Sequence, residues 1–196
     1  MRILAGEFKG RRLLPPPRGA ETRPITGLAK KSLFDILSPV LEGATILDLY
    51  CGTGTLGLEA ISRGASRCFF AERSAGAVER LTRNINALNA VDQCRIWRGD
   101  VERKLSSWLA QLNCLLDVIF VDPPYQMVRE WDWRKVQGSL FRPLADKLSA
   151  EGLVVLRSSG DAEAPKELAG LAELRVKTYG GMTITIYSPS KKAADV

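Results

Sequence analysis

The stretch of sequence that decides the fold reads Asp48-Leu49-Tyr50-Cys51-Gly52-Thr53-Gly54-Thr55-Leu56-Gly57-Leu58-Glu59. It starts within the apolar run 45–50, which has the length of a buried strand, and it leads into the helical spacing of residues 56–62. Gly52 and Gly54 let the backbone turn sharply and come close to a ligand, while Gly57 lets the helix pack closely on the strand. The stretch therefore predicts a strand, a binding loop and a helix in succession.

The rest of the chain continues this alternation of strands and helices. Short continuous apolar runs lie at 68–71, 94–97, 116–121 and 153–156. Helical spacing is found between them, at 75–88, 101–112 and 140–148. This alternation indicates a parallel sheet with helices on both faces. The runs 174–179 and 182–187 flank Gly180-Gly181 and predict a final hairpin, so we expect an α/β fold whose last strand is antiparallel.

The composition excludes several classes of protein. The chain has 196 residues, of which 45% are apolar and 26% charged, as in ordinary globular domains. It lacks both the ~20-residue apolar run of a membrane helix and the pattern of a signal peptide, so we expect a cytoplasmic protein that does not contact membranes. Histidine is absent, which removes the usual general base and the Ser-His and Cys-His nucleophile pairs. The four cysteines form no C-x-x-C pair, and we expect reduced thiols and no metal site.

The positive charge is concentrated near the N-terminus. The net charge is +6, and residues 1–35 hold eight basic against three acidic side chains, an excess of five. Such a segment favours a polyanionic partner such as nucleic acid, although a solvated basic arm would have the same composition. We predict two short strands in 1–14, a linker at Pro15-Pro16-Pro17 and a helix before Pro39. Residues 1–42 would then form a basic extension, 43–190 the main domain and 191–196 a tail.

The glycine loop fits two classes of ligand. Its G-x-G-x-x-G spacing, with Glu72 twenty residues after Gly52 to accept hydrogen bonds from a ribose, is found in sites for nicotinamide dinucleotides. We expect Asp48 to point into the same crevice, where it would repel a pyrophosphate but attract the amino group of S-adenosylmethionine. Asp100, followed by Val101, ends the third strand, where an adenine amine could be recognised. The acids therefore favour S-adenosylmethionine, although each could simply cap the helix that follows it.

A second motif, Asp122-Pro123-Pro124-Tyr125, directly follows the apolar run 116–121. Because the carboxyl ends of parallel strands share one crevice, this tetrapeptide is expected beside the glycine loop. The two prolines leave carbonyl acceptors without amide donors. The Asp122 carboxylate and the Pro123 carbonyl could each accept a hydrogen bond from an exocyclic base amine and stabilise the charge that grows on its nitrogen. Tyr125 could stack on an extruded base, although a rigid turn with a helix cap would explain the same residues.

These motifs resemble those of the amino-methyltransferases with an Asp-Pro-Pro-Tyr sequence. They most closely resemble the bacterial 16S ribosomal RNA guanine-N2 methyltransferase family of the guanine 966 type. The resemblance also involves Arg2-Ile3-Leu4-Ala5-Gly6, Lys9-Gly10-Arg11, Thr22-Arg23-Pro24, Leu33-Phe34, Gly57-Leu58-Glu59-Ala60, Ser62-Arg63-Gly64-Ala65 and Tyr179-Gly180 with Thr183. It implies a class I methyltransferase fold, for which we predict a seven-stranded sheet of order 3-2-1-4-5-7-6. It further implies S-adenosylmethionine as donor, N2 of a guanine in 16S ribosomal RNA as acceptor, and residues 122–125 as the catalytic segment.

The chain departs from the family pattern after Thr22-Arg23-Pro24, where an Asp, an Arg and a Glu are usual and this sequence has Gly27, Leu28 and Lys31. We predict a monomeric enzyme that acts on 16S ribosomal RNA or on an assembling small ribosomal subunit. Adenine-N6 methylation of DNA or RNA, an NAD-dependent oxidoreductase and a non-catalytic RNA-binding module are the alternatives. The residues predicted to contact RNA phosphates are Arg2, Lys9, Arg11, Arg12, Arg23 and Lys30.

Overall fold

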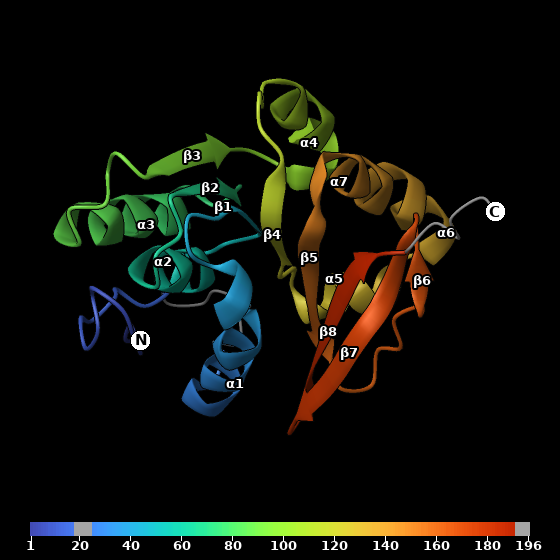
Figure 1. Ribbon diagram of the computed structural model, residues 1–196, viewed down its shortest axis with the longest axis horizontal. Helices are drawn as coiled ribbons and strands as arrows, with labels where there is room; N and C mark the ends of the chain where they lie inside the picture. The colour runs from blue at the N-terminus through green and yellow to red at the C-terminus, as the bar shows by residue number, and fades with distance from the viewer. Residues whose placement is uncertain (18–24, 191–196) are drawn as a thin grey trace.

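The computed structural model describes residues 1–17 and 25–190 and contains one mixed sheet (Figure 1). Its strands lie in the order β3-β2-β1-β4-β5-β8-β7-β6, and the first five are parallel neighbours. The strands are β1 (Thr45–Leu49), β2 (Arg67–Glu72), β3 (Cys94–Arg98), β4 (Leu116–Val121), β5 (Leu148–Ser159), β6 (Glu167–Leu168), β7 (Leu171–Tyr179) and β8 (Met182–Pro189).

The predicted α/β fold and strand order are confirmed, with one correction to the number of strands. The hairpin of β7 and β8 adds to β5 in antiparallel fashion, as expected. An eighth strand, β6, pairs with β7 at the edge of the sheet through two residues only. Two residues are too short to produce a recognisable alternation of apolar and polar side chains, which is why the sequence predicts seven strands.

Helices cover both faces of the sheet because both faces of its central strands are apolar. Helices α1, α2 and α3 lie on one face of the sheet and α4 and α7 on the other (Figure 1). Ile46, Val118 and Phe120 share a hydrophobic cluster with residues of the first group, and Leu47 and Ile119 share one with residues of the second. The helices are α1 (Gly27–Leu37), α2 (Thr55–Ser62), α3 (Ala75–Ala87), α4 (Val101–Ala110), α5 (Tyr125–Glu130), α6 (Trp133–Val136) and α7 (Arg142–Lys147), with a 3-10 turn at Ser38–Val40 and a π-helical turn at Gln137–Phe141. This two-sided burial explains why the sequence shows continuous apolar strands.

The N-terminal segment, residues 1–17, differs from the two strands that the sequence predicts in 1–14. It folds back on itself through backbone hydrogen bonds between residues 1–3 and 10–13, but these form an isolated bridge between Arg2 and Arg12 rather than two strands. The turn uses Gly6 and Gly10 at positive φ, and Gly6 lies so close to α2 that an added Cβ would meet the Ser62 carbonyl oxygen at 1.6 Å. This tight backbone contact ties the segment to α2.

A buried carboxylate completes this attachment. Glu59 of α2, with no exposed side-chain surface, accepts hydrogen bonds from the backbone N–H groups of Leu4 (2.8 Å) and Ala5 (3.1 Å). It also pairs with Lys30 of α1 (2.8 Å) and with Arg63 (2.9 Å). Residues 1–17 and 25–42 therefore share one hydrophobic core with the main sheet, to which Ile3, Phe8, Leu13 and Phe34 contribute.

Three further expectations concern the chain as a whole. All four cysteines are free thiols, as predicted. In the part of the chain that the structure describes, no helix is long and apolar enough to cross a membrane. The predicted tail 191–196 and Arg23 lie outside the described residues.

Candidate cofactor and acceptor site

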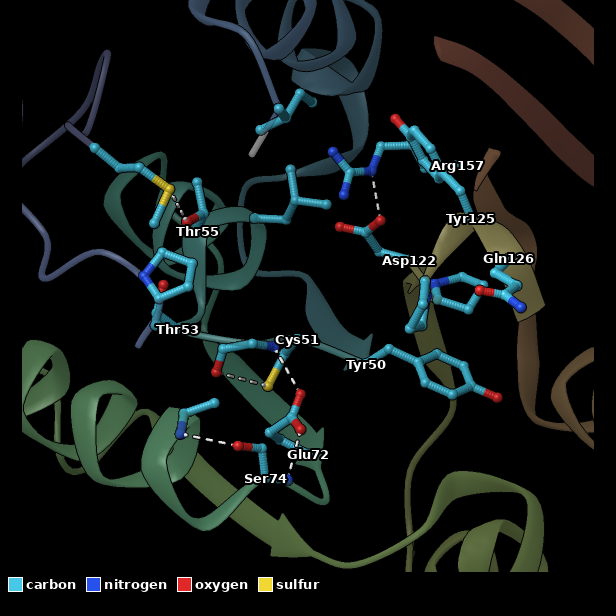
Figure 2. A pocket seen from close by; sticks show the side chains of 18 of the residues that line it. Tyr50, Cys51, Thr53, Thr55, Glu72, Ser74, Asp122, Tyr125, Gln126 and Arg157 are labelled. Atoms are coloured by element: carbon cyan, nitrogen blue, oxygen red, sulfur yellow. Dashed lines mark hydrogen bonds and ion pairs between the residues drawn. The ribbon is translucent and has the colours of Figure 1, made fainter. Parts of the chain in front are cut away.

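A cavity of about 330 Å³ opens at the carboxyl ends of β1, β2, β4 and β5 (Figure 2). Its wall combines the glycine loop, the last residue of β2, the tetrapeptide after β4 and the end of β5. Met1, Pro16 and Pro17 of residues 1–17 and Ile25, which precedes α1, belong to the same wall. Both motifs singled out in the sequence thus border one cavity, as the parallel sheet requires.

The glycine loop has the geometry that its sequence predicts. Gly52 and Gly54 adopt φ angles of 56° and 81°, in the left-handed region that favours glycine. A Cβ added at Gly52 would meet no atom within 4 Å, so this position keeps open space at the cavity wall. Gly54 does not line the cavity; it caps α2 and packs against Leu81. Gly57 lies against Phe70 of β2, whose ring an added Cβ would meet at 2.4 Å, which confirms the predicted close packing of helix and strand.

Glu72 lies at the cavity wall with its carboxylate held in place. One oxygen accepts a hydrogen bond from the Gly52 backbone N–H (3.0 Å) and the other from that of Ser74 (2.7 Å) (Figure 2). Each carboxylate oxygen can accept a second hydrogen bond. The cavity therefore offers fixed acceptors of the kind that the two hydroxyls of a ribose require.

Asp48 does not occupy the position that the sequence analysis gave it. Its carboxylate is buried, accepts a hydrogen bond from the Gly57 backbone N–H (2.9 Å) and lies beneath the glycine loop rather than in the cavity wall. Burial raises its pKa to about 8, and nearby Asp122 and Glu72 reinforce that effect. The prediction that Asp48 points into the crevice is wrong because alternation along β1 turns its side chain towards α2, on the same face as Ile46.

A smaller cavity of about 90 Å³ adjoins the main one and shares Tyr50, Glu72 and Asp122 with it. Asp100 and Val101 line this smaller cavity. Asp100 also caps α4 by accepting the Arg103 backbone N–H (3.2 Å), and its carboxylate lies 3.6 Å from the Arg73 guanidinium. Asp100 thus lines the smaller cavity and also has the capping role that the sequence left open.

The tetrapeptide after β4 borders the main cavity with all four of its residues. The Asp122 carboxylate forms an ion pair with Arg157 of β5, and the Arg157 guanidinium lies 5.6 Å from the centre of the Tyr125 ring. Burial raises the pKa of Asp122, while the charge of Arg157 and its hydrogen bond act in the opposite direction. Pro123 and Pro124 lead from the strand into α5, whose first residue is Tyr125.

Sequence reasoning missed several residues of the cavity wall. Arg157 and Ser159 come from the end of β5, and Arg129 comes from α5. Arg157 could have been found, because it is a lone cation at the end of an apolar strand next to β4. The contribution of Met1, Pro16 and Pro17 depends on how the N-terminal segment folds back, for which the sequence contains no local pattern.

The basic residues predicted to contact RNA have different surroundings. Arg2, Lys9 and Arg12 are exposed; Arg11 is also exposed, and its guanidinium donates a hydrogen bond to the Ala87 carbonyl oxygen. Lys30 is buried, and its ammonium group pairs with Glu59 and donates to the Arg2 carbonyl oxygen (2.7 Å). The prediction that Lys30 contacts RNA is therefore wrong: helical spacing places it on the inner face of α1.

The sheet order and the cavity with its glycine loop and strand-end carboxylate define a class I S-adenosylmethionine-dependent methyltransferase. A family model described as "Conserved hypothetical protein 95" matches residues 1–188, and the chain belongs to that family.

Relatives and a solved structure agree with this assignment. The chain is 33% identical over 190 residues to YlbH of Bacillus subtilis (strain 168), covering 95% of this chain and 98% of that protein. It is 31% identical over 189 residues to ribosomal RNA small subunit methyltransferase D of Escherichia coli (strain K12), covering 95% and 89%. The solved structure of the Escherichia coli protein yhhF is similar with a TM-score of 0.78 at 30% identity, covering 98% of this chain and 99% of that one.

Proposed function

We propose that this protein transfers a methyl group from S-adenosylmethionine to the exocyclic N2 amine of a guanine in 16S ribosomal RNA. The observation that supports this proposal best is that Asp122-Pro123-Pro124-Tyr125 and the glycine loop with Glu72 border one cavity. The similarity to ribosomal RNA small subunit methyltransferase D of Escherichia coli favours this RNA as the acceptor.

The cofactor would lie along the glycine loop. Glu72 would accept hydrogen bonds from the ribose hydroxyls, and the open space at Gly52 would let the backbone approach the ligand. The smaller cavity would take the adenine, with Asp100 and Val101 at its wall. When bound, S-adenosylmethionine supplies an electrophilic methyl group on a positively charged sulfur. Asp48 would contribute indirectly, by holding the start of α2 beneath the loop.

The acceptor base would lie against residues 122–125. The Asp122 carboxylate and the Pro123 carbonyl would accept the two N–H bonds of the amine, which localises the lone pair on its nitrogen. That lone pair forms the new bond to the methyl carbon while the electrons of the old bond leave with the sulfur, and the extra proton then passes from the nitrogen to solvent water. Tyr125 would contact the face of the extruded base, which contributes ~1–3 kcal/mol for one stacked base. None of these steps needs a histidine.

The N-terminal segment would help to position the RNA. Arg2, Lys9 and Arg12 are exposed on the same segment as Met1, which lines the cavity, and Arg11 is also exposed. Such cations contact phosphates and fix the register of the RNA without reading its bases. We include Arg23 in this proposal, although it lies outside the residues that the structure describes. We further infer that the enzyme acts in the cytoplasm as a monomer, on free 16S RNA or on an assembling small subunit.

The test is to incubate the protein with labelled S-adenosylmethionine and with small-subunit RNA or particles that lack the modification. We expect label in N2-methylguanosine when the digested nucleosides are separated by mass, and we expect Asp122→Ala to abolish it. Label in N6-methyladenosine would replace the guanine assignment with the adenine alternative. Full activity of Asp122→Ala would refute the catalytic role of the tetrapeptide.

A further inference from the structure

Arg157 is a buried cation to which the steps of methyl transfer given above assign no role. It follows the apolar residues 153–156 of β5, and only 9% of its side chain is exposed. Its guanidinium reaches the cavity, where it pairs with Asp122, lies over the Tyr125 ring at 5.6 Å and lies 3.8 Å from the Met182 sulfur. Burying an ion pair costs solvation that apolar residues would not lose, so packing alone does not explain it.

The position of the pair indicates a role at the reacting atoms. Arg157 Nε donates to one oxygen of the Asp122 carboxylate, and Figure 2 shows that carboxylate directed towards the space between the glycine loop and Tyr125. A carboxylate can accept several hydrogen bonds, so the other oxygen could meet an incoming amine while Arg157 fixes the group from behind. The ion pair thus restricts the orientation of the one acidic side chain in the tetrapeptide.

Several titratable groups from neighbouring elements lie near Asp122. The neighbouring strands β1 and β2 supply two further acids, Asp48 and Glu72, and the sulfhydryl of Cys51 faces the same three carboxyls. Arg129 of α5 also lines the cavity, but it is exposed and paired with Asp161 at 2.9 Å. Burial raises the pKa of Tyr50, which carries no charge near neutral pH. Arg157 is therefore the buried cation in contact with Asp122 among the residues that the structure describes.

We propose that Arg157 is a positioning residue that keeps the buried Asp122 carboxylate ionised and oriented to accept the hydrogen bond of the acceptor amine. The proposal rests on the proposed methyl transfer and adds a requirement to it. A protonated Asp122 could no longer accept with both oxygens, and a rotated one could not face the amine. Burial alone pushes the pKa of Asp122 upwards, and Arg157 opposes that push.

The direction of the expected pH effect follows from the two opposite influences on the Asp122 pKa, burial and the charge of Arg157. Methyl transfer needs ionised Asp122, so activity falls on the acid side as this carboxyl is protonated. Removing the adjacent positive charge raises the pKa of Asp122, and activity should then be lost at a higher pH. We expect the acid midpoint of kcat/KM to move upwards by ~1–3 pH units in Arg157→Met, the range that a neighbouring opposite charge produces. Arg157→Lys keeps the positive charge, so its midpoint should lie close to that of the parent protein.

Controls separate this role from a structural one. Arg134→Met removes an exposed cation of α6 that does not line the cavity and should leave the midpoint in place. Arg157→Met and its parent are also compared in the Asp48→Asn background. Asp48 has a pKa raised to about 8, and its protonation could otherwise cause the same loss of activity on the acid side. If Arg157→Met does not fold, Arg157→Gln replaces it, since its amide can still donate to Asp122 without carrying charge. An equal loss of activity at every pH, with an unchanged midpoint, would overturn the proposal.

A second readout does not depend on methyl transfer. Carbon-13 labelled aspartate lets the Asp122 carboxyl be titrated directly by NMR, with Asp122→Asn identifying its signal. We expect the titration midpoint of Asp122 to rise in Arg157→Met and to stay near that of the unmodified protein in Arg157→Lys. If the unmodified protein methylates no RNA, the proposed function fails, whereas an unchanged NMR midpoint in Arg157→Met refutes the role of Arg157 alone.

Discussion

Replacing Glu59 with alanine tests how strongly the N-terminal segment is bound to the methyltransferase sheet. Glu59 is fully buried and has four partners: two backbone N–H groups, Lys30 and Arg63. The alanine variant leaves the buried Lys30 ammonium with the Arg2 carbonyl oxygen but without its carboxylate. Removing one partner of a buried ion pair costs about 3–5 kcal/mol, and the two backbone donors lose their acceptor as well. We therefore expect the free energy of unfolding to fall by at least ~3 kcal/mol.

The assay is urea unfolding followed by circular dichroism, with Glu79→Ala as a matched control. With a slope of ~2 kcal/mol per molar urea, the loss corresponds to a midpoint about 1.5 M lower. Glu79 is an exposed glutamate on α3, and its replacement should change stability by no more than ~0.5 kcal/mol. Because Met1 lines the cavity, Glu59→Ala should also weaken binding of S-adenosylhomocysteine. A loss below ~1 kcal/mol with unchanged ligand affinity would refute the argument that Glu59 anchors the segment.

Three further outcomes are expected. Gly57→Ala should lower the free energy of unfolding by ~1–3 kcal/mol in thermal or urea unfolding, because its Cβ would lie 2.4 Å from the Phe70 ring; stability equal to the parent would contradict the packing. Asp48 has a pKa of about 8 when folded and an ordinary pKa when unfolded, so stability should decline as pH rises from 4 to 8, and Asp48→Asn should flatten that decline by ~1 kcal/mol or more at pH 7. Replacing Arg2, Lys9 and Arg12 together with alanine should reduce the salt dependence of RNA binding by a slope of ~2, whereas replacing Arg134 and Lys135 on α6 should not.

The sequence predicts the sheet well because its strands are buried on both faces. Continuous apolar runs such as 116–121 identify buried strands regardless of their neighbours, and the glycines that follow β1 adopt positive φ angles that other residues rarely adopt, so they mark the turn. The approximate position of the cavity follows from these elements, since parallel strands place Gly52, Glu72 and Asp122 at one edge.

The directions of individual side chains are harder to predict. Asp48 is one residue before the end of β1, and a shift by one position decides whether its carboxylate faces α2 or the cavity. Lys30 looks like a solvent-exposed cation until its partner Glu59, 29 positions away in the sequence, is placed beside it. The literal G-x-G-x-x-G spacing also left a dinucleotide site open, and the similarity to ribosomal RNA small subunit methyltransferase D favours S-adenosylmethionine instead.

The position of Met1 has a practical consequence for making the protein. Its sulfur lies 3.1 Å from the Thr55 hydroxyl at the cavity wall, so a purification tag fused in front of it would start at the mouth of the binding site. The opposite end of the described chain is safer. Strand β8 runs antiparallel to β5, which places Pro189 at the edge of the sheet remote from the cavity. Affinity handles or fluorescent labels therefore belong after β8, where they should leave catalysis undisturbed.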